Sequence, residues 1–237
     1  MQQAGLQFIN EEFFAASVLP DQIDELLSLG WRHFGEQFFR YNVGILDQDI
    51  RNVIPLRIRL SQFSLSKSQR RILRRNEDVD VVVKPIEIDQ SAEELFDRHK
   101  ERFDHSVPDS IYNFLSREPS TSPCEGREVR VTKQDELLAA SYFDVGKSST
   151  SGIYAIFEPT IADRSLGIFT MLKEIEYSIE TGREFYYQGY CYNGTSFYDY
   201  KKRFRGTEAF DWNGNWFGVT ALAGIGNNEV SGNNGAA

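Results

Sequence analysis

The succession of secondary-structure signals between residues 79 and 192 constrains the fold of this chain more than any other feature. Period-two hydrophobic runs predict strands, and runs of period 3.6 with capping signals predict helices. The predicted order is strand 79–88, helix 91–103, helix 108–117, strands 128–133, 136–145 and 152–157, helix 165–180 and strand 184–192. Short links between the three central strands favour antiparallel hairpins.

This order is typical of the GNAT-type acyltransferase fold, in which a cleft splits a mixed sheet at its middle. The sequence therefore predicts an α+β, GNAT-like acyltransferase domain over residues 79–223, with a mixed, mostly antiparallel sheet and flanking helices. Residues 1–78 should form a small N-terminal α+β lobe that contributes a basic helix. Residues 224–237, rich in Gly, Asn and Ala, are expected to be a disordered tail.

The basic side chains are concentrated in two short segments of an otherwise acidic chain. The net charge is −9, yet eleven of the 26 lysines and arginines lie in residues 57–75 and 201–205. An acidic surface argues against a nonspecific coat of nucleic acid. Such focused positive charge instead indicates a specific site for a polyanion.

Other features exclude several classes of protein. Two cysteines rule out a disulfide framework or a four-thiolate metal site, and with three histidines no metal site is predicted. We expect Cys191 to be a packed core thiol and His99 and His105 to be solvated, whereas His33 cannot be assigned. No apolar run is long enough for a membrane helix and no signal peptide is visible, so a cytoplasmic protein without membrane contact is expected.

A short basic helix is predicted over residues 67–75. Ser66 and Gln69 form a capping-box pattern that opens it. Like charges recur four residues apart along this helix and repel one another, which indicates an anionic partner; the alternative is a merely solvated basic face. The candidate polyanion-binding residues of this helix are Lys67, Gln69, Arg70, Arg71, Arg74 and Arg75.

A second candidate anion site lies where the predicted strand 152–157 leads into helix 165–180. Free backbone N–H groups at a helix start attract anions, Gly167 would let a phosphate approach, and Arg164 could add a charged donor. The candidate residues are Arg164, Ser165, Leu166 and Gly167. The alternative is an ordinary helix start with a salt-bridged arginine.

A third feature is the aromatic strand 184–192 and the basic segment after it. Tyrosines interleaved with lysines and arginines suit a single-stranded RNA end, because rings stack on bases and cations meet phosphates. Gly189 inside the strand indicates the close approach of a ligand or another backbone.

Together these motifs resemble the aminoacyl-tRNA–protein transferases of the arginyl-tRNA–protein transferase type, including the short bacterial forms that transfer leucine. The resemblance covers residues 19–218 and rests on the segments 66–76, 154–159, 164–167, 187–190 and 200–205. Two departures stand out. The cysteine cluster of the family is absent between Arg40 and Arg57, and residues 194–198 replace its Lys-Met pair, so recognition of the acceptor could differ.

The resemblance implies attack by the α-amine of a protein or peptide acceptor on the ester of aminoacyl-tRNA, which acts as co-substrate, with no other cofactor. The donated amino acid would be arginine or leucine, and the acceptor would carry an acidic terminal residue. A carboxylate, Asp144, Glu158 or Asp163, or water could take the amine proton. Tyr154 and Tyr187 could hold the carbonyl or the leaving ribose hydroxyl.

Four residues are candidates for binding the acceptor: Tyr190, Lys201, Arg203 and Arg205. Two other functions remain open, an acyl-CoA-dependent N-acyltransferase and a non-catalytic tRNA-binding relative. The sequence does not indicate an oligomeric state.

Overall fold

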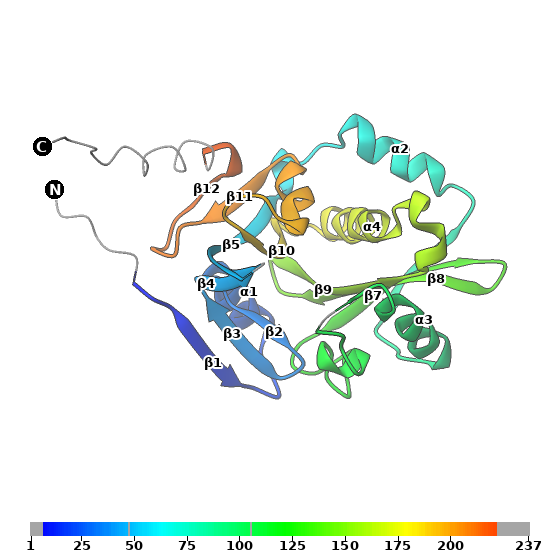
Figure 1. Cartoon of the computed structure of the whole chain (residues 1–237), viewed down its shortest axis with the longest axis horizontal. Helices are drawn as coiled ribbons and strands as arrows, with labels where there is room; N and C mark the ends of the chain where they lie inside the picture. The colour runs from blue at the N-terminus through cyan, green and yellow to red at the C-terminus, as the bar shows by residue number, and fades with distance from the viewer. Residues whose placement is uncertain (1–6, 47, 105, 222–237) are drawn as a thin grey trace, which may run out of the picture.

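The computed structural model describes residues 7–46, 48–104 and 106–221 of the chain (Figure 1). The predicted tail at residues 224–237 lies outside these residues. No helix in the described part of the chain is long and apolar enough to cross a membrane.

A nine-stranded sheet forms the centre of the molecule. Its strand order is β12-β11-β5-β10-β9-β8-β7-β6, and β4 also pairs with β5. Among the described strands of this sheet only β9 and β10 run parallel, so the mixed, mostly antiparallel sheet predicted for a GNAT-like α+β fold is confirmed. The strands are β4 (Val43–Leu46), β5 (Asp49–Arg59), β6 (Asp80–Pro85), β7 (Gly126–Lys133), β8 (Glu136–Val145), β9 (Ser149–Phe157), β10 (Phe185–Tyr192), β11 (Thr207–Phe210) and β12 (Trp216–Gly218).

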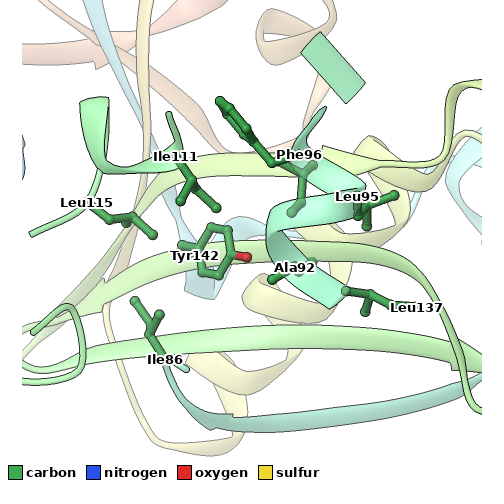
Figure 2. Close-up of a cluster of buried hydrophobic side chains, with 10 residues drawn as sticks. Ile86, Ala92, Leu95, Phe96, Ile111, Leu115, Leu137 and Tyr142 are labelled. Atoms are coloured by element: carbon green, nitrogen blue, oxygen red, sulfur yellow. The ribbon is translucent and has the colours of Figure 1, made fainter. Parts of the chain in front are cut away.

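Helices cover both faces of this sheet (Figure 1). The long helix α4 (Leu166–Glu180) packs on one face against β8 and β9, and α2 (Lys67–Arg75) packs on the outside of α4. Helix α3 (Gln90–Lys100) covers the other face. Figure 2 shows the apolar core beneath α3, where Tyr142 of β8 lies among side chains of α3 and neighbouring segments.

The N-terminal residues build a second, smaller sheet and also complete the first. Strands β1 (Asn10–Phe14), β3 (Gln37–Tyr41) and β2 (Arg32–Phe34) form a three-stranded sheet beside α1 (Pro20–Ser28). Strand β5, in contrast, lies within the main sheet between β10 and β11. The predicted division of the chain into a lobe of residues 1–78 and a domain of residues 79–223 stays a prediction.

Short 3-10 helices connect these elements, and one of them corrects a prediction. The helix expected at 108–117 is only the 3-10 turn η2 (Ile111–Asn113). Ser110 caps this turn through its hydroxyl, Ile111 and the following Leu115 pack in the core beneath α3, and Phe114 stacks on Tyr154. The others are η1 (Leu60–Gln62), η3 (Pro159–Arg164), η4 (Phe197–Arg203) and η5 (Val219–Ala221).

Strands β9 and β10 separate near the middle of the sheet. Their pairing ends at Ser151 and Tyr187, beyond which the two strands diverge. Each strand also carries an irregularity just past that point, opposite Tyr142 in β9 and next to Gly189 in β10. Bulges of this kind bend a strand and leave backbone groups unpaired, so the sheet opens here.

Candidate functional site

A cavity of about 930 Å³ occupies the gap between β9 and β10. Its walls come from β2 and β3, β9, the end of α3, the start of α4, β10 and η4. It lies where the sequence placed a cleft, and it is large enough for a substrate of several residues or a nucleotide with its substituent.

Two cations meet at Gly189 in the wall of this cavity. Arg32 is only 8% exposed; its Nη1 donates to Ser151 Oγ at 2.6 Å, while Nη2 has no partner among the described residues. Lys201 Nζ donates to the Tyr190 carbonyl oxygen at 3.1 Å. A Cβ added to Gly189, which has a φ of +87°, would lie 3.3 Å from Lys201 Nζ and 3.8 Å from Arg32 Nη2. Glycine thus lets both cations approach one point.

Neither cation forms an ion pair with the acidic groups that the structure describes. Burial and, to a smaller extent, the charge of Arg32 lower the pKa of Lys201 to about 8. Burial likewise lowers the pKa of Arg32, although nearby tyrosines and Asp144 oppose the shift. Buried charge without a counter-ion is costly, so this end of the cavity is suited to an anionic ligand.

Behind Arg32, the Asp144 carboxylate joins His33 and Cys124. His33 Nε2 donates to Asp144 Oδ2 at 2.8 Å and Nδ1 donates to the Gly35 carbonyl, while Cys124 Sγ donates to Asp144 Oδ1 at 3.3 Å. Burial lowers the pKa of His33, but Asp144 outweighs that effect and the pKa is raised. His33 is therefore a buried imidazolium, and the predicted catalytic Asp144 is fully engaged by its neighbours.

These three side chains are also the group in the described residues that comes nearest to a metal site. Their ligand atoms lie within 4.8 Å of one another. A tetrahedral site needs four ligands, and here the groups already satisfy one another by hydrogen bonds. The absence of a metal in the function stays a prediction.

The start of α4 forms another part of the cavity wall. Ser165 adopts a left-handed conformation with φ of 55° and its side chain does not cap the helix. Ser165, Leu166 and Gly167 line the cavity, so the first backbone amides of α4 are available to an anion there.

Arg164 turns away from the cavity. Its guanidinium binds both oxygens of Asp78, at 2.7 and 2.8 Å, and Asn76 Nδ2 donates to its carbonyl oxygen at 3.0 Å. Arg164 and Lys133 hold the pKa of Asp78 well below its usual range. The salt-bridged alternative considered for Arg164 thus describes its contacts, and these contacts join the end of α2 to the start of α4.

Aromatic side chains form a further part of the cavity wall. Tyr154 stacks on Phe114 with ring centroids 3.8 Å apart, and its hydroxyl has no partner among the described residues. Burial raises the pKa of Tyr154 to about 12. Of the four residues predicted to be catalytic, Tyr154 and Asp144 line the cavity.

The other two predicted catalytic residues lie outside the cavity wall. Glu158 binds Arg98 at 2.8 Å and caps η3, while Tyr187 is buried beside Arg57 and Trp216. Asp163 is exposed on η3, and its carbonyl oxygen accepts a hydrogen bond from Arg75.

The basic helix α2 has the predicted capping box. Ser66 Oγ accepts from the Gln69 backbone N–H, and Gln69 Oε1 accepts from the Ser66 N–H, so Gln69 is buried in the cap. Exposed cations cover the outer face of the helix: Lys67, Arg70, Arg71, Arg74 and Arg75. Through Arg75 and Asn76 the helix ends beside the start of α4.

The predicted acceptor residues separate into two groups. Tyr190 and Lys201 line the cavity, whereas Arg203 and Arg205 are exposed outside it, with Arg205 donating to Ser64 Oγ.

The sequence reasoning missed Arg32 and Arg102 and misplaced His99. His99 is 1% exposed and lines the cavity, which corrects the prediction that it is solvated; His105 lies outside the described residues. The burial predicted for Cys191 is confirmed. The only signal for Arg32 was a charge between the aromatic residues Trp31 and Phe34, which is too common to single out a site.

Comparison with known proteins places this geometry in a family. Residues 92–211 match the family described as arginine-tRNA-protein transferase, C terminus. A protein from Stenotrophomonas maltophilia (strain R551-3) called aspartate/glutamate leucyltransferase is 30% identical over 78% of this chain and 75% of its own length. One of the same name from Helicobacter hepaticus is 25% identical over 84% and 83%.

Among solved structures, FemX is similar with a TM-score of 0.46 at 12% identity, over 80% of this chain and 65% of FemX. The sequence matches extend over most of the chain and include α3, β9, the start of α4 and β10. The chain therefore belongs to the arginine-tRNA-protein transferase family.

Proposed function

We propose that this protein transfers leucine from aminoacyl-tRNA to the α-amino group of a protein or peptide whose first residue is aspartate or glutamate. The family gives the reaction class, aminoacyl transfer to protein, and the relatives named above are aspartate/glutamate leucyltransferases. One observation carries the acceptor assignment: Arg32 and Lys201 meet in the cavity wall without an acidic partner among the described residues.

The acceptor's acidic side chain supplies the missing counter-charge. A carboxylate bound by a guanidinium and an ammonium gains two charge-assisted hydrogen bonds. The buried site makes these bonds strong and leaves an amide or an apolar side chain unable to replace them. The acceptor's first residue is thereby fixed near the point where β9 and β10 diverge.

The choice of leucine over arginine rests on the remaining walls. Asp144 is the only acidic residue among the described residues that line the cavity, and it is engaged by His33 and Cys124. An arginine side chain would find no free carboxylate there. Apolar and aromatic side chains such as Phe34, Phe114 and Ile153 offer leucine a surface to pack against.

The chemistry needs position more than activation. The amine nitrogen attacks the ester carbonyl carbon, the bond from that carbon to the ribose oxygen breaks, and the proton lost by the neutral amine balances the one gained by the ribose oxygen. Because the ester is already activated, holding the two substrates in line supplies much of the rate. The Tyr154 hydroxyl, which has no hydrogen-bond partner among the described residues, is the candidate donor to the carbonyl or ribose oxygen.

The donor reaches the cavity from the side of α4. The exposed cations of α2 contact phosphates of the tRNA, and the open amides at Leu166 and Gly167 contact a phosphate near its 3′ end. Arg164 acts on the donor indirectly, by holding the end of α2 against the start of α4.

The test is a transfer assay with two donors and four acceptors. We expect the wild type to use leucyl-tRNA over arginyl-tRNA, and peptides beginning with Asp or Glu over matched peptides beginning with Asn or Gln. Acetyl-CoA with the same peptides tests the acyltransferase alternative. A wild type that does not distinguish Glu from Gln contradicts the assignment of the acidic acceptor.

Arg32→Met locates the acceptor site. It should lower kcat/KM for the acidic acceptor roughly 30- to 1,000-fold, as expected when a buried charge pair loses one partner at about 2–5 kcal/mol. Removing a buried charge that has no counter-ion in the described part of the chain should leave the free energy of unfolding unchanged or higher. Arg203→Met, which removes an exposed cation outside the cavity, is the matched control and should have no effect on acceptor use.

A further inference from the structure

The imidazole of His99 is buried at the end of the cavity next to α4 and serves none of the roles described above. It lies in the last turn of α3, is 1% exposed and lines the cavity. Its ring packs edge-on against Phe157, with centroids 4.5 Å apart, and against Phe103 and Tyr154 at 5.9 and 6.1 Å.

One backbone group fixes which nitrogen of His99 carries the proton. The Phe157 N–H donates to His99 Nδ1 at 3.0 Å, and the Phe157 carbonyl oxygen lies 3.1 Å from the same atom. A proton on Nδ1 would satisfy the carbonyl but orphan a buried N–H, which is the rarer and costlier defect. The proton therefore lies on Nε2, and His99 is a hydrogen-bond donor at that atom.

This donor is neutral and has no acceptor within the protein as described. Burial lowers the pKa of His99 to about 4, so the ring is uncharged at neutral pH. The described residues include no hydrogen-bond partner for Nε2. A buried ring that keeps one donor open beside a cavity is suited to a ligand acceptor.

The neighbours of His99 have the composition of a nucleoside site. The guanidinium of Arg102 lies over the rings of Phe157 and Phe103, 4.7 and 5.0 Å from their centroids, and Arg102 and both rings line the cavity. Aromatic rings and guanidinium planes are the surfaces on which proteins stack single-stranded RNA bases.

The same ring of Phe157 connects His99 to the start of α4. A Cβ added to Gly167 would lie 3.1 Å from Phe157 Cε1. The open amides at the start of α4, the Phe157 ring and the His99 imidazole are thus successive neighbours along one wall. A phosphate at the amides places the nucleoside attached to it beside Phe157 and His99.

We propose that His99 binds the 3′-terminal adenosine of the donor tRNA, donating from Nε2 to an acceptor atom of this nucleoside while the base stacks beside Phe157 and Arg102. This inference rests on the proposed function, because it takes aminoacyl-tRNA as the donor. It makes His99 a substrate-binding residue specific to the donor, with no part in holding the acceptor.

His99→Asn separates the binding role from the structural one. The Asn amide oxygen can replace Nδ1 as acceptor for the Phe157 N–H, but its side chain does not extend to the position of Nε2. We expect a folded variant with an unchanged unfolding midpoint, a KM for leucyl-tRNA raised about three- to tenfold, as for the loss of one neutral hydrogen bond, and an unchanged KM for the acceptor peptide. His99→Gln, which places an amide near Nε2, should recover part of the donor KM.

A second measurement does not depend on the stability of any variant. The non-hydrolysable probe 3′-leucylamido-3′-deoxyadenosine should inhibit the wild type competitively with leucyl-tRNA, and better than the matched cytidine analogue. In His99→Asn this preference for adenosine should shrink.

Three results would overturn the inference. One is an unchanged donor KM in a folded His99→Asn variant, another is a rise confined to the acceptor KM, and the third is a wild type that does not distinguish the two nucleoside probes. In each of these cases transfer by the wild type persists and the proposed function stands. A wild type that transfers from no charged tRNA would instead reject the proposed function together with this inference.

Discussion

At the scale of single residues, the cavity is defined by side chains whose environment opposes their preferred protonation state. Arg32 is a buried cation and Lys201 a half-buried one, and both have a lowered pKa. His99 is held neutral, whereas His33 is held charged by Asp144. Burial disfavours the charged form of each of these side chains. Whether a side chain is nevertheless charged depends on the neighbouring charged or hydrogen-bonding group that the fold places beside it.

Lys201 gives the acceptor site a pH dependence. Its pKa is lowered to about 8 from 10.5, so binding of an acidic acceptor should weaken as the pH rises through about 8, when the ammonium loses its proton. Calorimetry at several pH values should show this loss of affinity for the peptide. Measuring binding instead of rate avoids the opposing effect on the rate of the acceptor's own amine, which loses its proton in the same range. In Lys201→Arg the affinity should fall only at higher pH. A fall at the same pH as in the wild type would refute the assignment.

The lowered pKa of Lys201 affects the stability of the fold in the opposite direction from acceptor binding. Between pH 8 and 10.5 the unfolded chain binds more protons at Lys201 than the folded chain does, so this residue should make the free energy of unfolding rise with pH in that window. Acceptor binding and stability should therefore diverge above pH 8 in the wild type.

At the scale of elements, two short segments determine how the donor approaches: the outer face of α2 and the start of α4. The cap of α2 is made by Ser66 and Gln69 alone, so the cations on its outer face are not needed to form the helix. The start of α4, in contrast, depends on Gly167, because Phe157 lies directly against it.

Substituting Arg71 and Arg74 of α2 tests the tRNA contact. Both are exposed on the helix, and alanine preserves helix propensity, so the fold should be intact. If each contacts one phosphate, the double variant Arg71→Ala/Arg74→Ala should flatten the slope of log affinity against log salt by roughly 1.5 to 2. Filter binding at several salt concentrations would measure it, with Arg127→Ala as a surface control. An unchanged slope would remove α2 from the tRNA footprint.

Gly167→Ala tests the start of α4. The added Cβ would lie 3.1 Å from the Phe157 ring, so the ring, which packs against His99, must shift and disturb the proposed nucleoside site. We expect a raised KM for leucyl-tRNA with little change in the acceptor KM. Gly218→Ala, where the added Cβ meets only Thr220 at 3.9 Å, is the control. Equal behaviour of the two variants would show that nothing binds at this junction.

At the scale of the whole molecule, the N-terminal region is part of the catalytic sheet. Strand β5 pairs with β10 over most of its length and with β11 on its other side, and its Leu56 and Ile58 are fully buried. Strand β2 contributes Arg32 to the cavity. The small N-terminal sheet and the main sheet therefore serve one site.

Deleting residues 1–78 should consequently abolish folding instead of releasing a stable transferase domain. Removing β5 exposes the buried edges of β10 and β11 to water and leaves their backbone groups unpaired. We expect the fragment 79–237 to be aggregated or to lack a cooperative thermal transition, whereas the full chain should unfold in one transition. A fragment that melts cooperatively would establish residues 79–223 as an independent domain.

The sequence alone determined the elements and the family, because local signals carry them. Hydrophobic periodicity located the strands and helices from β6 to β10 except the turn at Ile111–Asn113, where the side chains pack by long-range contacts such as that of Phe114 with Tyr154. The capping box of α2 was readable because its hydrogen bonds join residues three apart. The linear motifs identified the family and, with it, Lys201 and Tyr190.

Only the tertiary structure decided which charged groups meet. Arg32 and Lys201 are far apart in sequence and meet because β2 and η4 both pack at the Gly189 bulge. Arg164, read from its motif as a donor ligand, is turned toward Asp78 by the docking of α2 on α4. His99 is buried because β9 lies against the end of α3. Long-range packing sets the partner of each charge, and neither composition nor spacing encodes that partner locally.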